Sequence, residues 1–580
     1  MRLPRLKLRQ RLSRPARLPQ WFRAPSSVDT PRIYDFNDER DSVVAEVVAR
    51  LVEQHAGAGQ SELEIVLSET AHAEIHRLER QKDEESRESL GFWRGLVRKL
   101  SKLDPDERRD ALEQISSRMA RDVAGNFDPR VYWVAQRLVP RVIAGVMNPP
   151  ALAREFLAPG RGELDSMVTV EGCVPDLHRL SRRGTLIYVP THSSNLDSLA
   201  LGDSLSQEGL PPVVYGAGKN LFTNPIISFF MHNLGAYRVD RRIRAELYKE
   251  VLKAYSTVMI ERGYHSLFFP GGTRGRSGMV ERHLKLGLTG TGVEAYARNC
   301  LRVQPGTPER RIYFVPVTIN YSVVLEAETL IEDYLKETGQ ARYIIEDDEF
   351  SRIDRWVAFF NKLQGQDASC VLRFGRPLDP FGNDVDDAGD SLSPNGRVVD
   401  PRTYVSRGGV PVLDPARDAG YTRELGRVLL DRYRSETVVM STQLVAHLMF
   451  RRLVEQTPGV SLFGRMRRRG DFAADHGALV QEIGHARDRL LELEAAGELR
   501  VSPFLRREAP ERTLERALSG WSYHRKTLLR PAEGRLVLED PSLALYYQNR
   551  LVDWSESLVE GWPPISRRAA AEIRKMGGGR

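Results

Sequence analysis

Residues 185–197, TLIYVPTHSSNLD, indicate the fold of this chain most directly. Thr185 to Val189 form a run of β-branched and aromatic residues, which is typical of a buried strand. Pro190 ends the run, and the polar residues after it are typical of the start of a helix. Because strands that lead into helices are the repeating unit of α/β sheets, we expect this fold class.

Four further apolar runs, separated by helical stretches, are predicted to be strands of the same sheet; they lie at residues 213–215, 266–269, 312–317 and 371–374. Four of the five predicted strands lead into a polar or glycine-rich segment. In open α/β sheets, ligands bind beyond the carboxyl ends of the strands. The unusual segments of this sequence therefore stand where a functional site is expected.

Helical patterns dominate on both sides of this α/β part, for example at residues 105–123 and 473–497. A stretch rich in Pro, Gly and Asp separates the sheet from the C-terminal helices and reads as a loop. The predicted parts are a basic N-terminal arm (1–33), a helical N-terminal domain (34–160), an α/β domain (161–380), a linker loop (381–420), a mostly helical C-terminal domain (421–574) and a flexible tail (575–580).

The composition, with 41% hydrophobic and 28% charged residues, is typical of a globular protein. No uncharged apolar run reaches the roughly 18 residues that a membrane-spanning helix needs. We therefore expect any membrane contact to be peripheral, at the cytoplasmic side of the cell membrane. The 3 cysteines have no paired spacing, which indicates a reducing compartment without a disulfide framework.

The net charge of +7 is concentrated at the N-terminus, where eight arginines and one lysine face a single acidic residue in residues 1–32. Leucines, Trp21 and Phe22 are interleaved with these charges. An anionic membrane surface would attract such an arm, although a disordered basic tail fits the pattern equally well. No stacking or groove-reading motif accompanies it, so no nucleic-acid partner is expected.

His192 and Asp197 are the candidate catalytic residues. Five residues of a regular helix turn through roughly 140°, so these side chains cannot share one helical face. If His192 precedes the helix and Asp197 lies in its first turns, the carboxylate can reach one ring nitrogen. The other nitrogen can then act as a general base at the strand end. An isolated pair at this spacing is more often a cap or a surface pair, but the strand end favours catalysis.

Basic residues beside glycine-rich turns are the candidate phosphate ligands. Residues 216–220, GAGKN, follow one predicted strand, and residues 235–242, GAYRVDRR, add arginines. Residues 268–278, FFPGGTRGRSG, combine two arginines with glycines whose N–H groups can approach an anion. This segment lacks the Gly-Lys-Ser/Thr ending of a nucleotide-binding P-loop, and no metal site is expected. The candidate ligands are Lys219, Arg238, Arg241, Arg274 and Arg276.

These segments, in this order, resemble the four blocks of the glycerolipid acyltransferase superfamily, which includes glycerol-3-phosphate and lysophosphatidate acyltransferases. HSSNLD at 192–197 is similar to the His-x4-Asp block, and residues 235–241 are similar to the second block. FPGGTR at 269–274 resembles the Phe-Pro-Glu-Gly-Thr-Arg block, and residues 315–317 resemble the proline block. LYYQNRL at 545–551 looks like the C-terminal signature of the large bacterial membrane-associated branch.

The resemblance implies a glycerol-phosphate acyltransferase-like α/β domain flanked by helical domains. It implies transfer of a fatty acyl group from acyl-CoA or acyl carrier protein to glycerol-3-phosphate in phospholipid biosynthesis, without a cofactor. His192 would be the general base, oriented by Asp197, and the basic residues would hold the acceptor phosphate. The residues that would shape the site are Gly271, Gly272, Thr273 and Pro316.

Two departures from the family pattern leave the acceptor open. Gly271 stands where the third block usually has a glutamate, so that carboxylate is either absent or relocated here. Residues 193–195, SSN, resemble lysophosphatidate enzymes more than the large branch. A lysophosphatidate acyltransferase therefore remains an alternative, as does a lipid-binding scaffold that has the fold without the activity.

Overall fold

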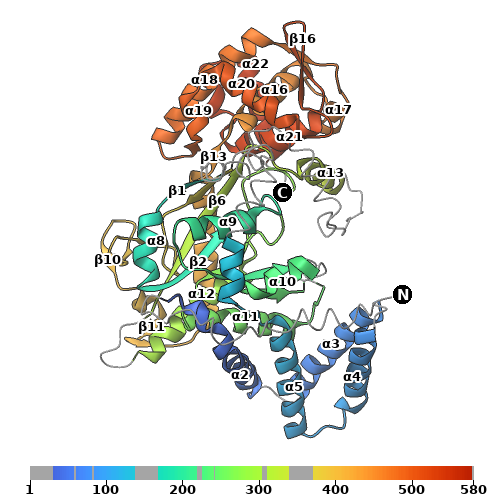
Figure 1. Ribbon diagram of the computed structural model, residues 1–580, viewed down its shortest axis with the longest axis vertical. Coiled ribbons are helices and arrows are strands. Elements are labelled where there is room, and N and C mark those ends of the chain that lie inside the picture. The colour runs from blue at the N-terminus through green and yellow to red at the C-terminus, as the bar shows by residue number, and fades with distance from the viewer. Residues whose placement is uncertain are drawn as a thin grey trace.

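The computed structural model describes residues 30–57, 60–80, 84–136, 168–218, 225–240, 242–303, 310–338 and 370–577. N-terminal helices lie at one end, C-terminal helices lie at the other, and a β-sheet lies between them (Figure 1). Most of the predicted basic arm lies outside the described residues. The architecture is mixed α/β with a largely parallel sheet and helical flanks, which confirms the α/β class that the sequence predicts.

The main sheet has seven strands in the order β1-β7-β6-β2-β5-β3-β4. All neighbouring strands pair in parallel except β6 and β7, which are antiparallel. The strands are β1 (Val168–Gly172), β2 (Gly184–Pro190), β3 (Val214–Gly218), β4 (Ala236–Val239), β5 (Ser266–Leu267), β6 (Arg311–Tyr321) and β7 (Cys370–Phe374).

All five strands predicted from the sequence are present in the main sheet, but the sequence did not predict its other two strands, β1 and β4. β4 lies in the segment 235–242, which the sequence predicts as a source of phosphate ligands and not as a strand, and β1 carries Glu171 and ends at Gly172. Both are edge strands, which need less apolar sequence because one side of each has no neighbouring strand. β6 extends four residues beyond its predicted end, to Tyr321.

β2 lies at the centre of the sheet, and its two faces pack against different helices. Leu186 and Tyr188 belong to a core that also contains C-terminal helical residues such as Leu448. Ile187 and Val189 face the opposite side, where they pack with residues of α12 (Leu286–Arg302) and α15 (Pro415–Ser435). Because the strand is buried on both faces, its sequence is continuously apolar rather than alternating.

The N-terminal helices are α2 (Phe36–His55), α3 (Gln60–Glu79), α4 (Glu84–Leu100) and α5 (Pro105–Val123). A capping box fixes the start of α5, because the side chain of Asp104 accepts from the N–H of Glu107 and the side chain of Glu107 accepts from the N–H of Asp104. These helices form a separate apolar core with α11 (Glu246–Glu261) and with Val214 and Tyr237 of the sheet edge. The other helices around the sheet are α8 (Val174–Ser181), α9 (Asp197–Gln207), α10 (Pro225–Asn233) and α13 (Ala327–Thr338).

Residues 381–420, which the sequence predicts to be a linker loop, are packed and contain short strands. Phe381 stacks on Tyr404 and contacts Tyr296 of α12 edge-on, so the segment is packed against the α/β part. Asp379 and Asp386 accept backbone N–H groups in tight turns, which accounts for the Asp and Gly content. The segment contains β8 (Asp384–Val385), β9 (Ser391–Leu392), β10 (Val398–Val399), η5 (Pro401–Val405), β11 (Ser406–Arg407) and β12 (Val410–Pro411).

The C-terminal part is mostly helical and includes small sheets. Its elements after α15 are β13 (Val438–Val439), α16 (Ser441–Gln456), α17 (Leu462–Met466), β14 (Ala473–Asp475), α18 (His476–Ala495), β15 (Arg500–Val501), α19 (Pro503–Arg507), α20 (Pro510–Trp521), β16 (Leu529–Ala532), β17 (Arg535–Leu538), α21 (Pro541–Gln548), η6 (Asn549–Trp554), η7 (Ser557–Val559) and α22 (Pro564–Gly577). Because α22 includes residues 575–577, this part of the predicted tail is helical.

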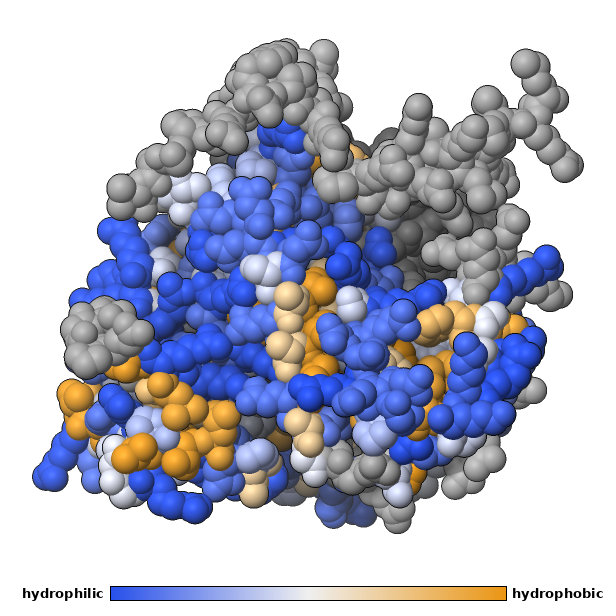
Figure 2. All heavy atoms as spheres, turned by 90° about the horizontal axis from the view of Figure 1, so that it is seen from below, coloured by the Kyte–Doolittle hydropathy of each residue, from blue (hydrophilic) through white to orange (hydrophobic). Residues whose placement is uncertain are grey.

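The described surface is mainly hydrophilic. Figure 2 shows apolar side chains in separate groups on the face seen from below, with hydrophilic ones between them. Exposed large apolar side chains, such as Ile65 of α3 and Phe463 of α17, belong to different parts of the chain. No helix within the described residues has the length and hydropathy that a membrane span requires.

Candidate active site

The candidate site lies where three neighbouring strands end. His192 follows the carboxyl end of β2, and the glycine- and arginine-rich segment 270–278 follows β5, which pairs with β2. The segment after β6, the other neighbour of β2, contains Glu326. Because parallel strands end at the same edge, segments that are far apart in the sequence meet there.

His192 and Asp197 form a hydrogen-bonded pair. Nδ1 of His192 lies 2.8 Å from Oδ2 of Asp197, and α9 begins at Asp197 itself. The histidine therefore precedes the helix and the carboxylate reaches back to it, which is the geometry that the sequence predicts. A carboxylate oxygen only accepts, so Nδ1 carries the proton and Nε2 keeps its lone pair. The imidazole is 18% exposed, whereas Asp197 is fully buried.

Asp197 is itself held by several donors. Its Oδ2 accepts the N–H groups of Ser193 at 2.6 Å and Ser194 at 3.0 Å. Its Oδ1 accepts the hydroxyl of Tyr321, the last residue of β6, at 2.8 Å. Burial and the Asp197 charge place the pKa of Tyr321 well above its ordinary value, so this phenol remains a donor. The carboxylate has one orientation, which fixes the imidazole in turn.

The backbone and ring of His192 are fixed as well. The N–H group of His192 donates to Oε1 of Glu281 at 2.7 Å, and its carbonyl accepts from the N–H of Gly275 at 2.8 Å. The ring stacks on Phe269 with centroids 4.2 Å apart. Burial raises the pKa of Glu281 to about 7, against the influence of the His192 N–H and of the Arg550 charge.

Arg274 lies beside the same loop through a buried carboxylate. Glu326 accepts the N–H of Asn195 at 2.8 Å and the hydroxyl of Ser194 at 2.9 Å. Nη1 of Arg274 lies 3.5 Å from Oε1 of Glu326. Burial raises the pKa of Glu326, and the Arg274 charge opposes that rise. The guanidinium is 23% exposed, so it can meet both this carboxylate and a ligand.

Arg550 of η6 reaches the site from the C-terminal helices. Its Nη2 donates to the hydroxyl of Ser193 at 3.3 Å, and its Nε is buried without a hydrogen-bond partner among the described residues. Burial lowers the pKa of Arg550, although the group remains a cation. A second contact beside it joins Nδ2 of Asn549 to the carbonyl of Ser277 at 2.8 Å. The C-terminal segment that the sequence singled out therefore packs on the first block and on the residues that follow the third block.

Arg276 and Arg238, the other two predicted phosphate ligands within the described residues, pair with carboxylates of neighbouring helices. Arg276 pairs with Glu337 of α13. Arg238 lies on β4, three strand positions from β2, with Nη1 3.5 Å from Oδ1 of Asp122 in α5. Lys219 and Arg241 lie outside the described residues. Of the five candidates, Arg274 has the contacts that join it to the loop of His192.

The residues predicted to shape the site take distinct positions. Gly272 has φ +74° and lies under the side chain of Lys285, so a side chain there would be strained and would clash. Thr273 is exposed. Pro316 pairs in register with Val189 of β2, and its carbonyl accepts the N–H of Gly375. Gly271 borders Glu281, since a Cβ built there would lie 3.3 Å from Oε1 of that residue.

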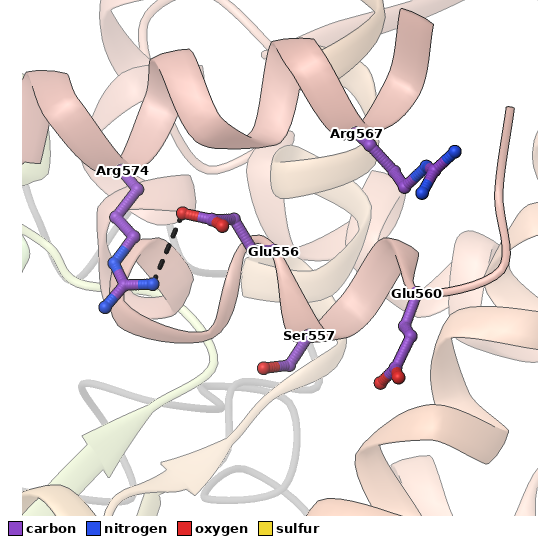
Figure 3. Close-up of a pocket in the computed structure, with 5 residues that line it drawn as sticks. All are labelled: Glu556, Ser557, Glu560, Arg567 and Arg574. Carbon is purple, nitrogen blue, oxygen red and sulfur yellow. Dashed lines mark hydrogen bonds and ion pairs between the residues drawn. The ribbon is translucent and has the colours of Figure 1, made fainter. Parts of the chain in front are cut away.

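A separate pocket lies on the outer C-terminal helices. Figure 3 shows its lining of Glu556, Ser557, Glu560, Arg567 and Arg574, with an ion pair between Glu556 and Arg574. Its lining contains none of the residues of the four predicted blocks, which lie at the strand ends instead. Among the described residues, no group of three or more His, Cys, Asp or Glu side chains could hold a metal ion.

Sequence reasoning missed four residues of this site: Tyr321, Glu281, Glu326 and Arg550. The first and third follow the predicted fourth block, where polar residues at a strand end were a usable signal. Arg550 lies inside the C-terminal stretch that resembles a family signature, but nothing there indicated a contact with Ser193. Glu281 had no local signal.

Comparison with known proteins agrees with the geometry. Residues 172–320 match the family model described as Acyltransferase, a range that contains all four blocks. The chain is 27% identical over 211 residues to the glycerol-3-phosphate acyltransferase of Xylella fastidiosa (strain M23), which covers 35% of this chain and 22% of that protein. The chain is also 30% identical over 162 residues to the glycerol-3-phosphate acyltransferase of Pseudomonas aeruginosa (strain LESB58). This alignment covers 28% of this chain and 18% of that protein.

The matched part thus spans about a fifth of the length of these two curated relatives, at 22% and 18%. The residues that match the family model include the strands and loops that carry His192, Asp197 and Arg274. Residues 172–320 therefore form an acyltransferase domain of the glycerolipid acyltransferase superfamily, similar to that of glycerol-3-phosphate acyltransferases.

Proposed function

We propose that this protein transfers a fatty acyl group from acyl-CoA or acyl carrier protein to a hydroxyl of glycerol-3-phosphate, as a step of phospholipid synthesis. The observation that carries the proposal is the pair of His192 and Asp197 at the end of β2, in a domain that matches acyltransferases. No cysteine is needed, because the acceptor hydroxyl attacks the thioester directly.

His192 acts as the general base. Nε2 takes the hydroxyl proton while the acceptor oxygen forms a bond to the thioester carbonyl carbon. The tetrahedral intermediate then collapses, the carbon–sulfur bond breaks, and the leaving thiolate takes the proton from Nε2. Asp197 accepts from Nδ1 and so holds the tautomer whose Nε2 can take a proton. The reaction balances without an oxidant, a reductant or a metal ion.

Arg274 and Arg550, which join the loop 192–195 through different residues, bind the acceptor phosphate. Contacts with Glu326 and Ser193 join the two guanidinium groups to that loop, and the Nε of Arg550 has an unused proton. A guanidinium binds phosphate through two parallel hydrogen bonds, which fix orientation as well as charge. Positioning of this kind supplies a large part of the rate enhancement in bimolecular reactions.

The test is an acyl-transfer assay with labelled acyl-CoA or acyl carrier protein and either glycerol-3-phosphate or lysophosphatidate. We expect His192→Ala to lower kcat by about 10²- to 10⁴-fold, whereas Arg274→Ala chiefly raises the KM for the acceptor. His178→Ala, on α8, is the matched control and should leave both constants unchanged. Near-normal turnover of folded His192→Ala would refute the proposal, and preference for lysophosphatidate would favour the alternative acceptor.

We also propose that the protein works at an anionic membrane surface, on the cytoplasmic side of the cell membrane. The support is the N-terminal arm, whose eight arginines and one lysine in residues 1–32 attract anionic lipid. The full chain should sediment with vesicles that contain phosphatidylglycerol and not with pure phosphatidylcholine vesicles. Removal of residues 1–29 should weaken this binding, and equal binding to both vesicle types would contradict the proposal.

A further inference from the structure

Glu281 contacts the residue that carries the proposed base. Its Oε1 accepts the backbone N–H of His192 at 2.7 Å, across 89 positions of sequence. The same peptide segment is fixed on its other side, where the carbonyl of His192 accepts from the N–H of Gly275. Asp197 binds the ring and the N–H groups of the next two residues, so the contacts of Glu281 and Gly275 are the ones that hold the N–H and carbonyl of His192 itself.

The carboxylate of Glu281 also occupies a particular volume. A Cβ on Gly271 would lie 3.3 Å from its Oε1 and 3.5 Å from its Cγ. A longer side chain at position 271 would therefore project into the space that Glu281 fills. Gly271 is not in the left-handed region of φ, so its backbone would accept another residue without strain. Position 271 and position 281 thus compete for one site beside His192.

The surroundings of this carboxylate are those of the active site rather than of a surface ion pair. The charges that act on it belong to His192, Arg550 and Asp197, and the buried phenol of Tyr433 on α15 faces it as well. Within the described residues, the side chain that accepts the His192 N–H is that of Glu281. Loss of this contact would leave a partly buried N–H group without its acceptor, next to the catalytic ring.

We propose that Glu281 is a positioning residue that fixes the backbone of His192. It replaces, from another position in the sequence, the glutamate that the family pattern has where this chain has Gly271. The inference rests on the proposed function of His192 as the base. It accounts for the departure at Gly271: the carboxylate is relocated by ten positions rather than absent, and glycine at 271 leaves room for it.

The proposal predicts that Gly271→Glu lowers kcat in the native protein but raises it in the Glu281→Ala variant. Glu281→Ala removes the acceptor and should lower kcat about 10- to 100-fold with little change in KM, because the base is misplaced rather than the acceptor released. Gly271→Glu alone crowds two carboxylates into one volume and should also lower kcat. The double variant Gly271→Glu/Glu281→Ala restores one carboxylate and should be at least about fivefold more active than either single variant.

Glu281→Gln is the conservative variant. Its amide oxygen can still accept the His192 N–H, so it should retain most of the activity. Glu294→Ala is the matched control, since Glu294 pairs with Arg298 on α12 and has no contact with His192. A double variant no more active than Glu281→Ala, or a kcat of Glu281→Ala within twofold of the native value, overturns the proposal.

Hydrogen–deuterium exchange supplies a readout that does not depend on the activity. The peptide around residues 190–196 should exchange at least about tenfold faster in Glu281→Ala and should regain its protection in the double variant. If the native protein proved inactive with both acceptors, the proposed function would fail, while the exchange pattern would still decide the role of Glu281. Unchanged exchange in Glu281→Ala would overturn that role.

Discussion

At the scale of the residue, His192 is fixed through its imidazole ring and through its backbone N–H and carbonyl groups. Asp197 and Phe269 hold the ring, while Glu281 and Gly275 hold the backbone. Such pre-organisation is what a general base needs, because a misplacement of about 1 Å can cost roughly a hundredfold in rate. The arrangement also places a carboxyl group whose ionisation is costly beside the base.

Glu281 should therefore make the stability depend on pH. Its pKa is raised by burial from 4.5 to about 7, with His192, Arg550, Asp197 and Tyr433 facing it. Below the unfolded pKa the carboxyl is protonated in both states. Between pH 4.5 and about 7 only the unfolded chain ionises, so stability is lost as the pH rises through this range.

Glu281→Gln has no such titration. The free energy of unfolding of this variant minus that of the native protein should therefore increase with pH. The expected growth between pH 4.5 and pH 8 is about 1–3 kcal/mol, because one unit of pKa corresponds to about 1.4 kcal/mol and partial exposure reduces the effect. Urea unfolding of both proteins at several pH values measures it. A difference that stays constant with pH would contradict the raised pKa.

At the scale of the element, the site depends on how closely α21 packs on the loop after β5. Gly278 has φ +78°, and a Cβ there would lie 2.1 Å from the carbonyl oxygen of Tyr546 in α21. The contact of Asn549 with Ser277 continues this interface. Glycine at 278 is thus required for its backbone conformation and for the close approach of the helix, and the approach brings Arg550 to Ser193.

Gly278→Ala tests this packing. It should cost more than the roughly 1–2 kcal/mol that positive φ alone costs an alanine, and it should lower acyl transfer because α21 must move. Gly534→Ala is the matched control, since Gly534 has φ +73° with nothing within 4 Å of its Cβ position. It should show the backbone cost alone in thermal unfolding and retain full activity. Equal effects of the two variants would mean that the packing of α21 is unimportant.

At the scale of the whole molecule, the C-terminal helices and the sheet share one apolar core. Leu186 and Tyr188 of β2 lie in the same cluster as Leu448 of α16 and Trp521 of α20. The N-terminal helices pack instead on α11 through a different cluster. The C-terminal part is therefore expected to unfold together with the acyltransferase domain, although a separate helical domain was predicted there.

Leu448→Ala should destabilise the entire shared core by about 2–5 kcal/mol. In urea, the loss of helical circular dichroism and the loss of amide protection in β2 should shift together to lower concentration. Ile65→Ala on α3, where the side chain is 57% exposed, should change stability by less than about 0.5 kcal/mol. Protection of β2 that remained at its native midpoint in Leu448→Ala would show that the two parts unfold independently.

The sequence by itself determined the α/β class, the strands that enter the site and the pair of His192 and Asp197. These features are local: β2 is a run of 7 residues, and the paired side chains are five positions apart. The sequence did not determine that residues 381–420 pack against the α/β part, nor did it determine which arginines approach the loop of His192.

The tertiary structure alone decided the partners of the loop. Glu281 and Arg550 reach residues 192 and 193 across 89 and 357 positions, and no periodicity or motif encodes such a contact. The order of the strands sets which loops become neighbours, and only the packed chain shows that Gly271 leaves a space that Glu281 fills. A local pattern fixes the proposed base; long-range packing decides what holds it in place.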